Sequence, residues 1–186
     1  MNIKSTIKKL SLGEQKDVEN IYSHLTMRKI QKGDFLLQAG QICKHYFFVE
    51  SGSVRLFYQK NDIDYTVWIG SKGEVFTNLE SYLDGSKSRI AIQALEPSTV
   101  YTINKANSDL LAQKSNFYNT LLRKTVEIAF VSLSKNVISF QSEEASERYK
   151  RIENEKNWLS RYPLKYISTF IGITQSSLSR IRAKKD

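Results

Sequence analysis

The chain has 186 residues, 40% of them hydrophobic and 25% charged, which is enough to bury the core of one large domain or two modest ones. Lysine and arginine exceed aspartate and glutamate by nine, and this surplus favours a polyanionic partner such as nucleic acid or an acidic membrane face. Cys43 is the only cysteine, which excludes an internal disulfide, a four-cysteine iron–sulfur cluster and a zinc ribbon.

The sequence carries no segment typical of export or membrane insertion. Its first residues, MNIKSTIKKLSLGEQ, contain lysines but no apolar run of signal-peptide length. No stretch approaches the roughly 20 apolar residues that a spanning helix needs. A single thiol also fits a reducing compartment. We therefore expect a cytoplasmic protein that does not act at a membrane.

The first 103 residues predict a short helix followed by a β-rich domain. Residues 14–25 carry apolar side chains three and four positions apart, which indicates a helix. The predicted strands that follow are Tyr46–Glu50, Val54–Gln59, Tyr65–Ile69, Arg89–Leu95 and Thr99–Ile103. Six of the eight glycines fall between residues 33 and 85, in the turns that separate such runs. Short strands closed by glycine turns predict an antiparallel sandwich or barrel.

Two helices are predicted after the β-rich domain. Asn104 is a candidate cap for a short helix over 105–113, and a long helix is predicted over 116–141. Five apolar residues of the long helix recur close to a heptad spacing: Phe117, Leu121, Ile128, Val131 and Ile138. The long helix either packs on its own domain or pairs with a second copy of the chain along this seam.

The C-terminal residues predict a smaller domain that contains a helix-turn-helix. Residues 142–157 are polar and helical in pattern, and Pro163 marks a break before two final helices. Gly172 supplies the turn within Leu164 to Lys184, because glycine tolerates a positive φ. Small Ser168 suits the point where the two helices touch. Apolar residues on both sides of the turn hold the crossing angle: Ile167, Phe170, Ile171, Ile173, Leu178 and Ile181.

A helix-turn-helix of this kind docks on duplex DNA, and the residues around its second helix suit that task. Thr174 can cap the helix through its hydroxyl. The candidate base contacts are Gln175, Ser176, Ser179 and Arg180, since glutamine can pair with adenine and arginine with guanine. Lys165 and Lys184 are candidate phosphate contacts. Because such DNA readers bind as two-fold dimers, we favour the long helix as a dimerisation helix.

The chain resembles the Crp-Fnr family of transcription regulators over nearly its whole length. The resemblance rests on KGDFLLQAGQ, YFFVESGSVRLFYQ and GEVFTN in the first part, and on ASERYKRI and PLKYISTFIGITQSSLSRIR at the end. It implies an α+β fold in three parts: a cyclic-nucleotide-binding-like jelly roll over 1–115, a dimerisation helix over 116–141 and a DNA-binding domain over 142–186.

The resemblance also implies a mode of action and a set of partners. We expect a homodimer that binds double-stranded DNA at an inverted repeat and contacts RNA polymerase. An unidentified small-molecule effector would reorient the DNA-binding domains through the dimer helix and the segment near 139–144. Two alternatives stay open: a regulator that responds to a cyclic nucleotide, and a dimeric scaffold or ligand-binding protein that does not bind DNA.

Family members that bind cyclic AMP carry a Gly-Glu pair and, about ten residues later, an Arg-Ser or Arg-Thr pair. By resemblance these positions read Thr77-Asn78 and Ser88-Arg89 here. Asn78 lacks the carboxylate, and a one-residue shift along a strand sends Arg89 to the opposite face. We therefore expect a degenerate cyclic-nucleotide site. The candidate effector pocket comprises Phe76, Thr77, Asn78, Leu79, Glu80, Ser88 and Arg89, with Glu80 as a weak substitute for the acid.

Metal-dependent and catalytic functions find little support in the sequence. A haem or metal ion would have to use His24 and His45, which are isolated from each other in the sequence. Jelly-roll oxygenases need clustered histidine and carboxylate ligands, and no HxH or HxxxE spacing occurs. The sequence shows no nucleophile–base set and no phosphate-binding glycine loop. We expect neither an enzyme nor a resident cofactor.

Overall fold

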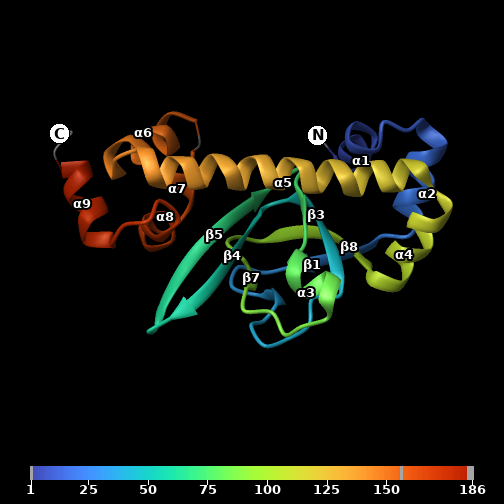
Figure 1. Cartoon of the computed structure of the whole chain (residues 1–186), viewed down its shortest axis with the longest axis horizontal. Helices are drawn as coiled ribbons and strands as arrows, with labels where there is room; N and C mark the ends of the chain where they lie inside the picture. Colours follow the sequence, from blue (N-terminus) through green and yellow to red (C-terminus); the bar gives the residue numbers. More distant parts are fainter. Residues whose placement is uncertain (1, 156, 184–186) are drawn as a thin grey trace. The chain divides into compact units, whose positions relative to one another are not determined.

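The computed structural model describes residues 2–155 and 157–183, and for residues 154 and 155 it describes the backbone alone. The chain divides into two compact units. The first unit comprises residues 1–56 and 69–130, and the second comprises residues 57–68 and 131–186. Figure 1 labels most of the helices and strands.

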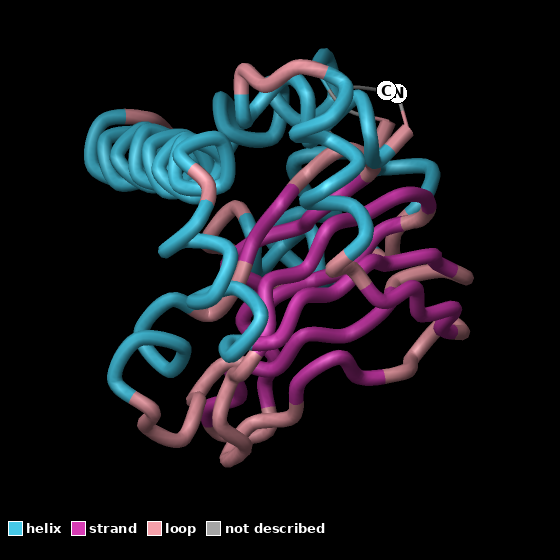
Figure 2. Tube along the Cα trace, turned by 90° about the vertical axis from the view of Figure 1, so that its right-hand side faces the viewer, coloured by secondary structure: helices cyan, strands magenta, loops and turns pink. Residues whose placement is uncertain are grey.

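Two four-stranded sheets form the β-rich part of the molecule, which Figure 2 shows in magenta. One sheet has the order β1 (Thr26–Ile30), β8 (Ser98–Asn104), β3 (His45–Ser51) and β6 (Val75–Phe76). The other has the order β2 (Phe35–Leu37), β7 (Ala91–Ala94), β4 (Ser53–Lys60) and β5 (Ile63–Ser71). Strands β1, β3 and β8 pair antiparallel, as do β2 and β7. The predicted antiparallel β architecture is confirmed.

All five predicted strands are present, but three others were not predicted. Strand β1 exposes four of its five residues, so it lacks the alternation that marks a half-buried strand. Strands β2 and β6 have three and two residues, too few for a pattern. The predicted start of β7 was wrong: the strand begins at Ala91, so Arg89 lies in the irregular segment before it.

The β4–β5 hairpin turns at Asn61 and Asp62, whose φ angles are 51° and 59°. Positive φ at both central residues is the signature of the tight hairpin turn that matches the twist of the flanking strands, and after glycine it is asparagine and aspartate that tolerate it best. Tyr58 and Tyr65 stack across the two strands with ring centroids 5.2 Å apart. These features stiffen the part of the hairpin that belongs to the second unit.

Helices cover one side of the first unit and complete its core. They are α1 (Ile3–Ser11), α2 (Gln15–Ser23), α4 (Lys105–Lys114) and the start of α5 (Asn116–Ser142), while α3 (Leu79–Asp84) follows β6. The predicted cap of α4 is confirmed, because the amide of Asn107 donates to Asn104 Oδ1 at 2.8 Å. Helix α1 was not predicted. The core shared by these helices and the sheet includes Ile7, Ile21, Phe48, Ile103, Tyr118 and Leu121.

The second unit contains the end of α5 and four shorter helices. These are α6 (Ala145–Glu155), α7 (Trp158–Arg161), α8 (Leu164–Phe170) and α9 (Gln175–Ala183). Pro163 immediately precedes α8, as expected from its restriction of the preceding backbone. The buried side chains between the short helices include Trp158, Tyr162, Ile167, Ile171 and Leu178. Within the described ranges, no helix combines the length and apolar character needed to cross a bilayer.

Candidate nucleic-acid interface and ligand site

The turn between α8 and α9 requires a glycine. Gly172 has a φ of 77°, in the left-handed region that side chains disfavour. A Cβ atom at this position would also lie 2.7 Å from Cε1 of Phe140. The turn is closed by the amide of Ile173, which donates to the carbonyl of Ser168 at 2.9 Å. The predicted role of Gly172 is therefore explained by both its backbone and its surroundings.

Helices α8 and α9 pack against each other through small and apolar side chains. Ile167 and Leu178 are fully buried, and Ser168 is 1% exposed at the contact. Phe170 packs edge-on against Trp158 of α7, with ring centroids 5.0 Å apart. Ile181 is half-buried. The residues expected to face inward do so, and the α8–α9 pair is a packed element of the second unit.

The outer surface of α9 is polar and positively charged. Gln175, Ser176, Ser179 and Arg180 are exposed. Arg182, which the sequence analysis did not single out, is exposed as well. The two arginines lie in the last turn of the helix. An exposed face of this composition can donate and accept hydrogen bonds along a polyanion.

Flanking residues complete this surface. The hydroxyl of Thr174 accepts a 3.1 Å hydrogen bond from the amide of Ser177, so the predicted cap of α9 is confirmed. Lys165 is exposed on α8, and Arg161 is exposed at the end of α7. Lys184, the other candidate phosphate contact, lies outside the described residues.

A single guanidinium joins the end of α5 to the end of α8. Arg148 of α6 donates from Nε to the carbonyl of Ile171 at 2.9 Å. Its Nη1 donates to the carbonyls of Glu143 and, at 3.5 Å, Ser139. The guanidinium also lies over the ring of Phe140, 5.1 Å from its centroid. Phe140 thus contacts both Arg148 and the glycine turn.

A second arginine reinforces this junction. Arg151 donates from Nη1 to the Glu143 carboxylate at 2.5 and 2.7 Å, and from Nη2 to the Ser139 hydroxyl at 2.7 Å. The hydrogen bond from Ser139, aided by Arg151, lowers the pKa of Glu143 below its ordinary value. The segment near 139–144, expected to transmit a signal, is therefore bonded to α6.

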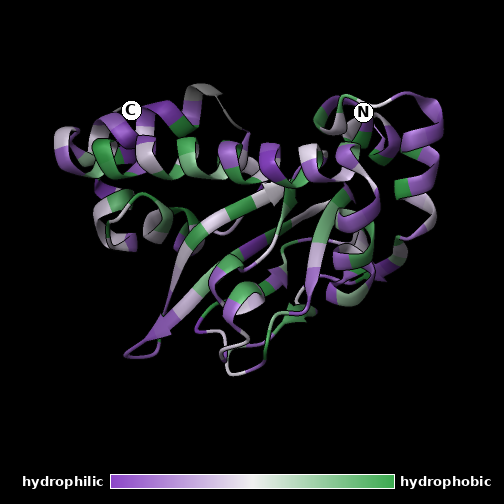
Figure 3. Ribbon diagram, turned by 45° about the vertical axis from the view of Figure 1, so that its right-hand side comes forward, coloured by the Kyte–Doolittle hydropathy of each residue, from purple (hydrophilic) through white to green (hydrophobic). Residues whose placement is uncertain are grey.

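Helix α5 exposes a regular row of large apolar side chains. The row recurs at steps of four, three, four and three residues: Val126, Phe130, Leu133, Val137 and Phe140. Their exposed fractions lie between 39% and 68%. Figure 3 shows hydrophobic positions, in green, along α5. Such spacing places the five on one face of a helix.

The residues predicted from the sequence as the dimer seam differ from this row in their exposure and in the face of α5 on which they lie. Leu121 is fully buried in the core of its own unit, so it is not available to a second chain. Ile128, Val131 and Ile138 are each more than half exposed, and Phe117 is 37% exposed. At about 100° per residue, these four lie on a different face of α5 from Phe130 and Val137.

In the candidate ligand site, the two central positions are buried and bonded to each other. Asn78 is 8% exposed and Ser88 is 4% exposed. Asn78 Nδ2 donates to Ser88 Oγ at 2.5 Å, and Asn78 Oδ1 accepts from the amide of Ser81 at 3.4 Å, capping α3. Ser88 Oγ in turn donates to the carbonyl of Ile90 at 2.6 Å. These groups satisfy one another within the protein.

The charged residues of this region point outward. The Arg89 side chain is 83% exposed and pairs with Glu80 at 3.5 Å, and the Glu80 side chain is 60% exposed. Leu79 is 37% exposed. Thr77 donates to the carbonyl of His45 at 2.8 Å, whereas Phe76 is buried and stacks on Phe47. The structure therefore does not gather the seven predicted pocket residues into one lining.

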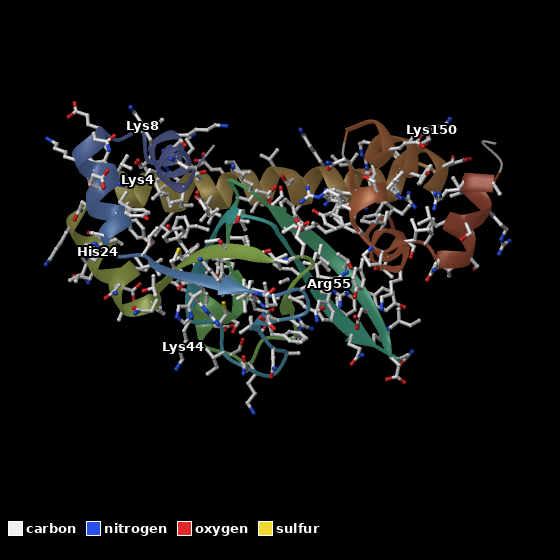
Figure 4. All side chains as sticks on the ribbon, turned by 180° about the vertical axis from the view of Figure 1, so that it is seen from behind. Lys4, Lys8, His24, Lys44, Arg55 and Lys150 are labelled. Carbon is white, nitrogen blue, oxygen red and sulfur yellow. The ribbon has the colours of Figure 1, made fainter. Side chains whose placement is uncertain are left out.

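Sequence analysis missed a buried arginine in the second sheet. Arg55 of β4, labelled in Figure 4, is 2% exposed. Its Nε and Nη2 donate to Gln93 Oε1 of β7 at 3.2 and 2.8 Å. The arginine inside the apolar run VRLF was the sequence signal for a buried polar contact, because arginine is almost never fully buried without partners.

The two histidines lie apart in the first unit. His24 Nδ1 bonds to the carbonyl of Asn20 at 2.8 Å at the end of α2. His45 opens β3, with its ring 6.1 Å from that of Phe47. In the described part of the chain, no three His, Cys, Asp or Glu side chains form a group that could hold a metal ion.

Comparison with known proteins gives a family match for the first part of the chain. Residues 27–115, which include most of the β-rich part, match the cyclic nucleotide-binding domain family. No curated protein sequence matches the chain.

Solved structures extend the likeness to nearly the full length. The c-di-GMP-responsive global regulator CLP of Xanthomonas campestris is 14% identical, with a TM-score of 0.74 over 92% of this chain and 91% of that chain. A CooA variant of Carboxydothermus hydrogenoformans is 16% identical, with a TM-score of 0.73 over 99% and 84%. A protein assigned to the Crp/Fnr family from Eubacterium rectale is 11% identical, with a TM-score of 0.72 over 92% and 83%.

At these identities the likeness shows the fold. Together with the domain match, it confirms the resemblance to the Crp-Fnr family that the sequence motifs indicated. The jelly roll and the long helix that follows it are confirmed.

Proposed function

We propose that this protein is a sequence-specific DNA-binding transcription regulator of the Crp-Fnr type, in which the α8–α9 pair is a helix-turn-helix. One observation carries the proposal: α9 buries Leu178 against α8 while it exposes Gln175, Ser176, Ser179 and Arg180. A helix held by one apolar face and presenting polar side chains on the other has the form needed to enter a major groove.

The exposed residues divide between two tasks. Gln175 and Arg180 suit bidentate contacts with adenine and guanine, and Ser176 and Ser179 suit single hydrogen bonds to base edges. Lys165 and Lys184 suit phosphate contacts, which add affinity but carry no sequence information. Thr174 fixes the start of α9 through its hydrogen bond to Ser177. The surplus of positive charge supports the choice of DNA as partner.

The proposal includes a homodimer that pairs along α5 and binds an inverted repeat. The exposed row of Val126, Phe130, Leu133, Val137 and Phe140 supports this, because a heptad-spaced row of large apolar side chains on a helix surface is unfavourable in water. We place the seam on this row. RNA polymerase as a further partner and a cytoplasmic location follow from the same proposal.

Sedimentation velocity distinguishes the two faces of α5. Leu133→Glu places a charge in the proposed seam and is expected to give a monomer at concentrations where the parent chain is a dimer. Ile128→Glu is the matched control on the other face, and it is expected to leave the dimer intact. The opposite pattern would move the seam to Ile128, Val131 and Ile138.

The proposed effector site is a degenerate cyclic-nucleotide site. A guanidinium would have to neutralise the phosphate, and a carboxylate would have to hold the ribose. The buried pair Asn78 and Ser88 offers neither group, and Arg89 is exposed beside Glu80. The effector is therefore a molecule of different chemistry, or the protein works without one. A cyclic-nucleotide-responsive regulator is the alternative that this geometry disfavours.

Gel-shift titration with genomic fragments tests the proposal. We expect retention of particular fragments over competitor DNA at moderate salt. Arg180→Ala should weaken specific binding by about 1–3 kcal/mol and relax the preference at one base pair per half-site. Arg28→Ala removes the same charge from exposed β1 and serves as the control. If no fragment is preferred, the protein is a dimeric scaffold or ligand-binding protein.

A further inference from the structure

We infer that the distal part of the β4–β5 hairpin, residues 57–68, is an autoinhibitory contact on α8 that lowers the affinity of the α8–α9 pair for DNA. The inference rests on the proposed function and concerns how that same surface is regulated. The hairpin residues belong to the same compact unit as the C-terminal helices, although about 100 residues separate them in the sequence.

Two hydrogen bonds join the hairpin to α8. The amide of Thr66 donates to the hydroxyl oxygen of Thr169 at 3.2 Å. The hydroxyl of Thr169 lies 3.4 Å from that of Thr66, to which it can donate. Thr66 is 4% exposed, so the contact is a packed one. Its partner Thr169 lies in the last turn of α8, three residues before Gly172.

The position of β5 explains why the hairpin needs such a partner. Strand β5 is the outermost strand of its sheet, after β2, β7 and β4. The outer amides of an edge strand have no neighbouring strand and must bond to something else or to water. Thr169 supplies that partner for Thr66. Helix α8 thus covers part of an open sheet edge.

The contact is weak enough to open. The Thr169 hydroxyl also lies 3.3 Å from the carbonyl of Lys165 and 3.2 Å from that of Tyr166, so it keeps partners in its own helix when the hairpin leaves. The freed Thr66 amide can bond to water. Undocking the hairpin from α8 therefore loses about one net hydrogen bond. This loss corresponds to roughly a fivefold change in the equilibrium constant between the docked and undocked states. An effector with a modest preference for one state can shift such a balance.

The docked hairpin occupies the side of α8 that DNA would approach. Thr169 and exposed Lys165 are four residues apart, so they lie on the same face of α8. Lys165 is a proposed phosphate contact. The hairpin carries two carboxylates, exposed Asp62 at its turn and Asp64 on the same face of β5 as Thr66. The volume of the docked hairpin and its negative charge both oppose the approach of a DNA phosphate backbone to α8.

Thr169→Val is the direct test, because valine keeps the shape of threonine but cannot accept the hydrogen bond. We expect faster hydrogen–deuterium exchange in residues 63–68 and about fivefold tighter DNA binding. Thr120→Val on α5 is the matched control, since the Thr120 hydroxyl bonds to the carbonyl of Asn116 in its own helix. It should change neither quantity.

A second variant keeps the inference falsifiable if Thr169→Val folds poorly. Asp62→Asn removes one carboxylate and keeps a residue that tolerates the positive φ; it should tighten DNA binding most at low salt. Equal or weaker binding by both variants, with the parent chain still binding DNA, overturns the inference and leaves the proposed function standing. Absence of specific binding by the parent and by both variants overturns the proposed function and the inference together.

Discussion

Arg148 donates from Nε to the carbonyl oxygen of Ile171, 2.9 Å away, and so ties α6 to the last residue before the glycine turn. The same guanidinium donates to the carbonyl of Ser139 near the end of α5. Carbonyls at helix ends lack partners within the helix, and a charged donor satisfies them well. The Arg148 side chain therefore links the C-terminal ends of α5 and α8.

Replacing Arg148 by methionine should destabilise the second unit. We expect a loss of about 1–2 kcal/mol, since hydrogen bonds to a charged, half-buried donor are lost together. Urea denaturation followed by tryptophan fluorescence reports on this unit, because Trp158 lies in its core. Lys150→Met, at an exposed position of the same helix, is the control and should change the midpoint little. Equal effects of the two variants would contradict the role of Arg148.

Cyclic nucleotides should not bind the parent chain. Asn78 and Ser88 satisfy each other at 2.5 Å, so a nucleotide would have to break this bond without gaining a guanidinium or a carboxylate. Isothermal titration calorimetry with cyclic AMP and cyclic GMP should give no binding heat beyond dilution. Clear micromolar affinity for either would show that another group neutralises the phosphate.

Stability should fall just below neutral pH because of His45. Burial, and then the charges of Arg28 and Lys44, lower the pKa of His45 below its ordinary value of 6.5. The folded chain then binds fewer protons than the unfolded chain in this range. The stabilisation is complete above pH 6.5 and is lost as the pH falls through the lower folded-state value.

His45→Gln should therefore reduce the difference in unfolding free energy between pH 7.5 and pH 5.5, two conditions chosen on either side of the ordinary value. Chemical denaturation at the two pH values measures it. His24→Gln, at the end of α2, is the control variant. An unchanged pH dependence in His45→Gln would assign the acid sensitivity to other groups.

Local patterns predicted much of this fold. The spacing of apolar residues located α2 and α5, Asn104 located the start of α4, and Gly172 located the turn between α8 and α9. These features are determined by residues close together in the sequence, where helical period and turn chemistry act directly. The inward and outward faces of α9 followed from the same period.

Contacts between distant segments were not predictable in the same way. Nothing in the sequence near Thr66 indicates that its amide would meet Thr169. The period of α5 was recognised, but several faces of that helix carry apolar residues, and only packing shows that Leu121 is buried in its own unit. Arg89 was expected to point outward because of a one-residue shift along a strand. The structure places Arg89 in an irregular segment before the strand, where its side chain is also exposed.

Selection of binding sites from a library of random duplex DNA tests the central claim most directly. Two α9 helices related by a two-fold axis should enrich an inverted repeat with half-site centres about 10–10.5 base pairs, or roughly 34 Å, apart. Selection with Arg180→Ala should lose the preference at one base pair in each half-site. Enrichment of no sequence, or of a single site without two-fold symmetry, would contradict the assignment of this protein as a dimeric DNA-binding regulator.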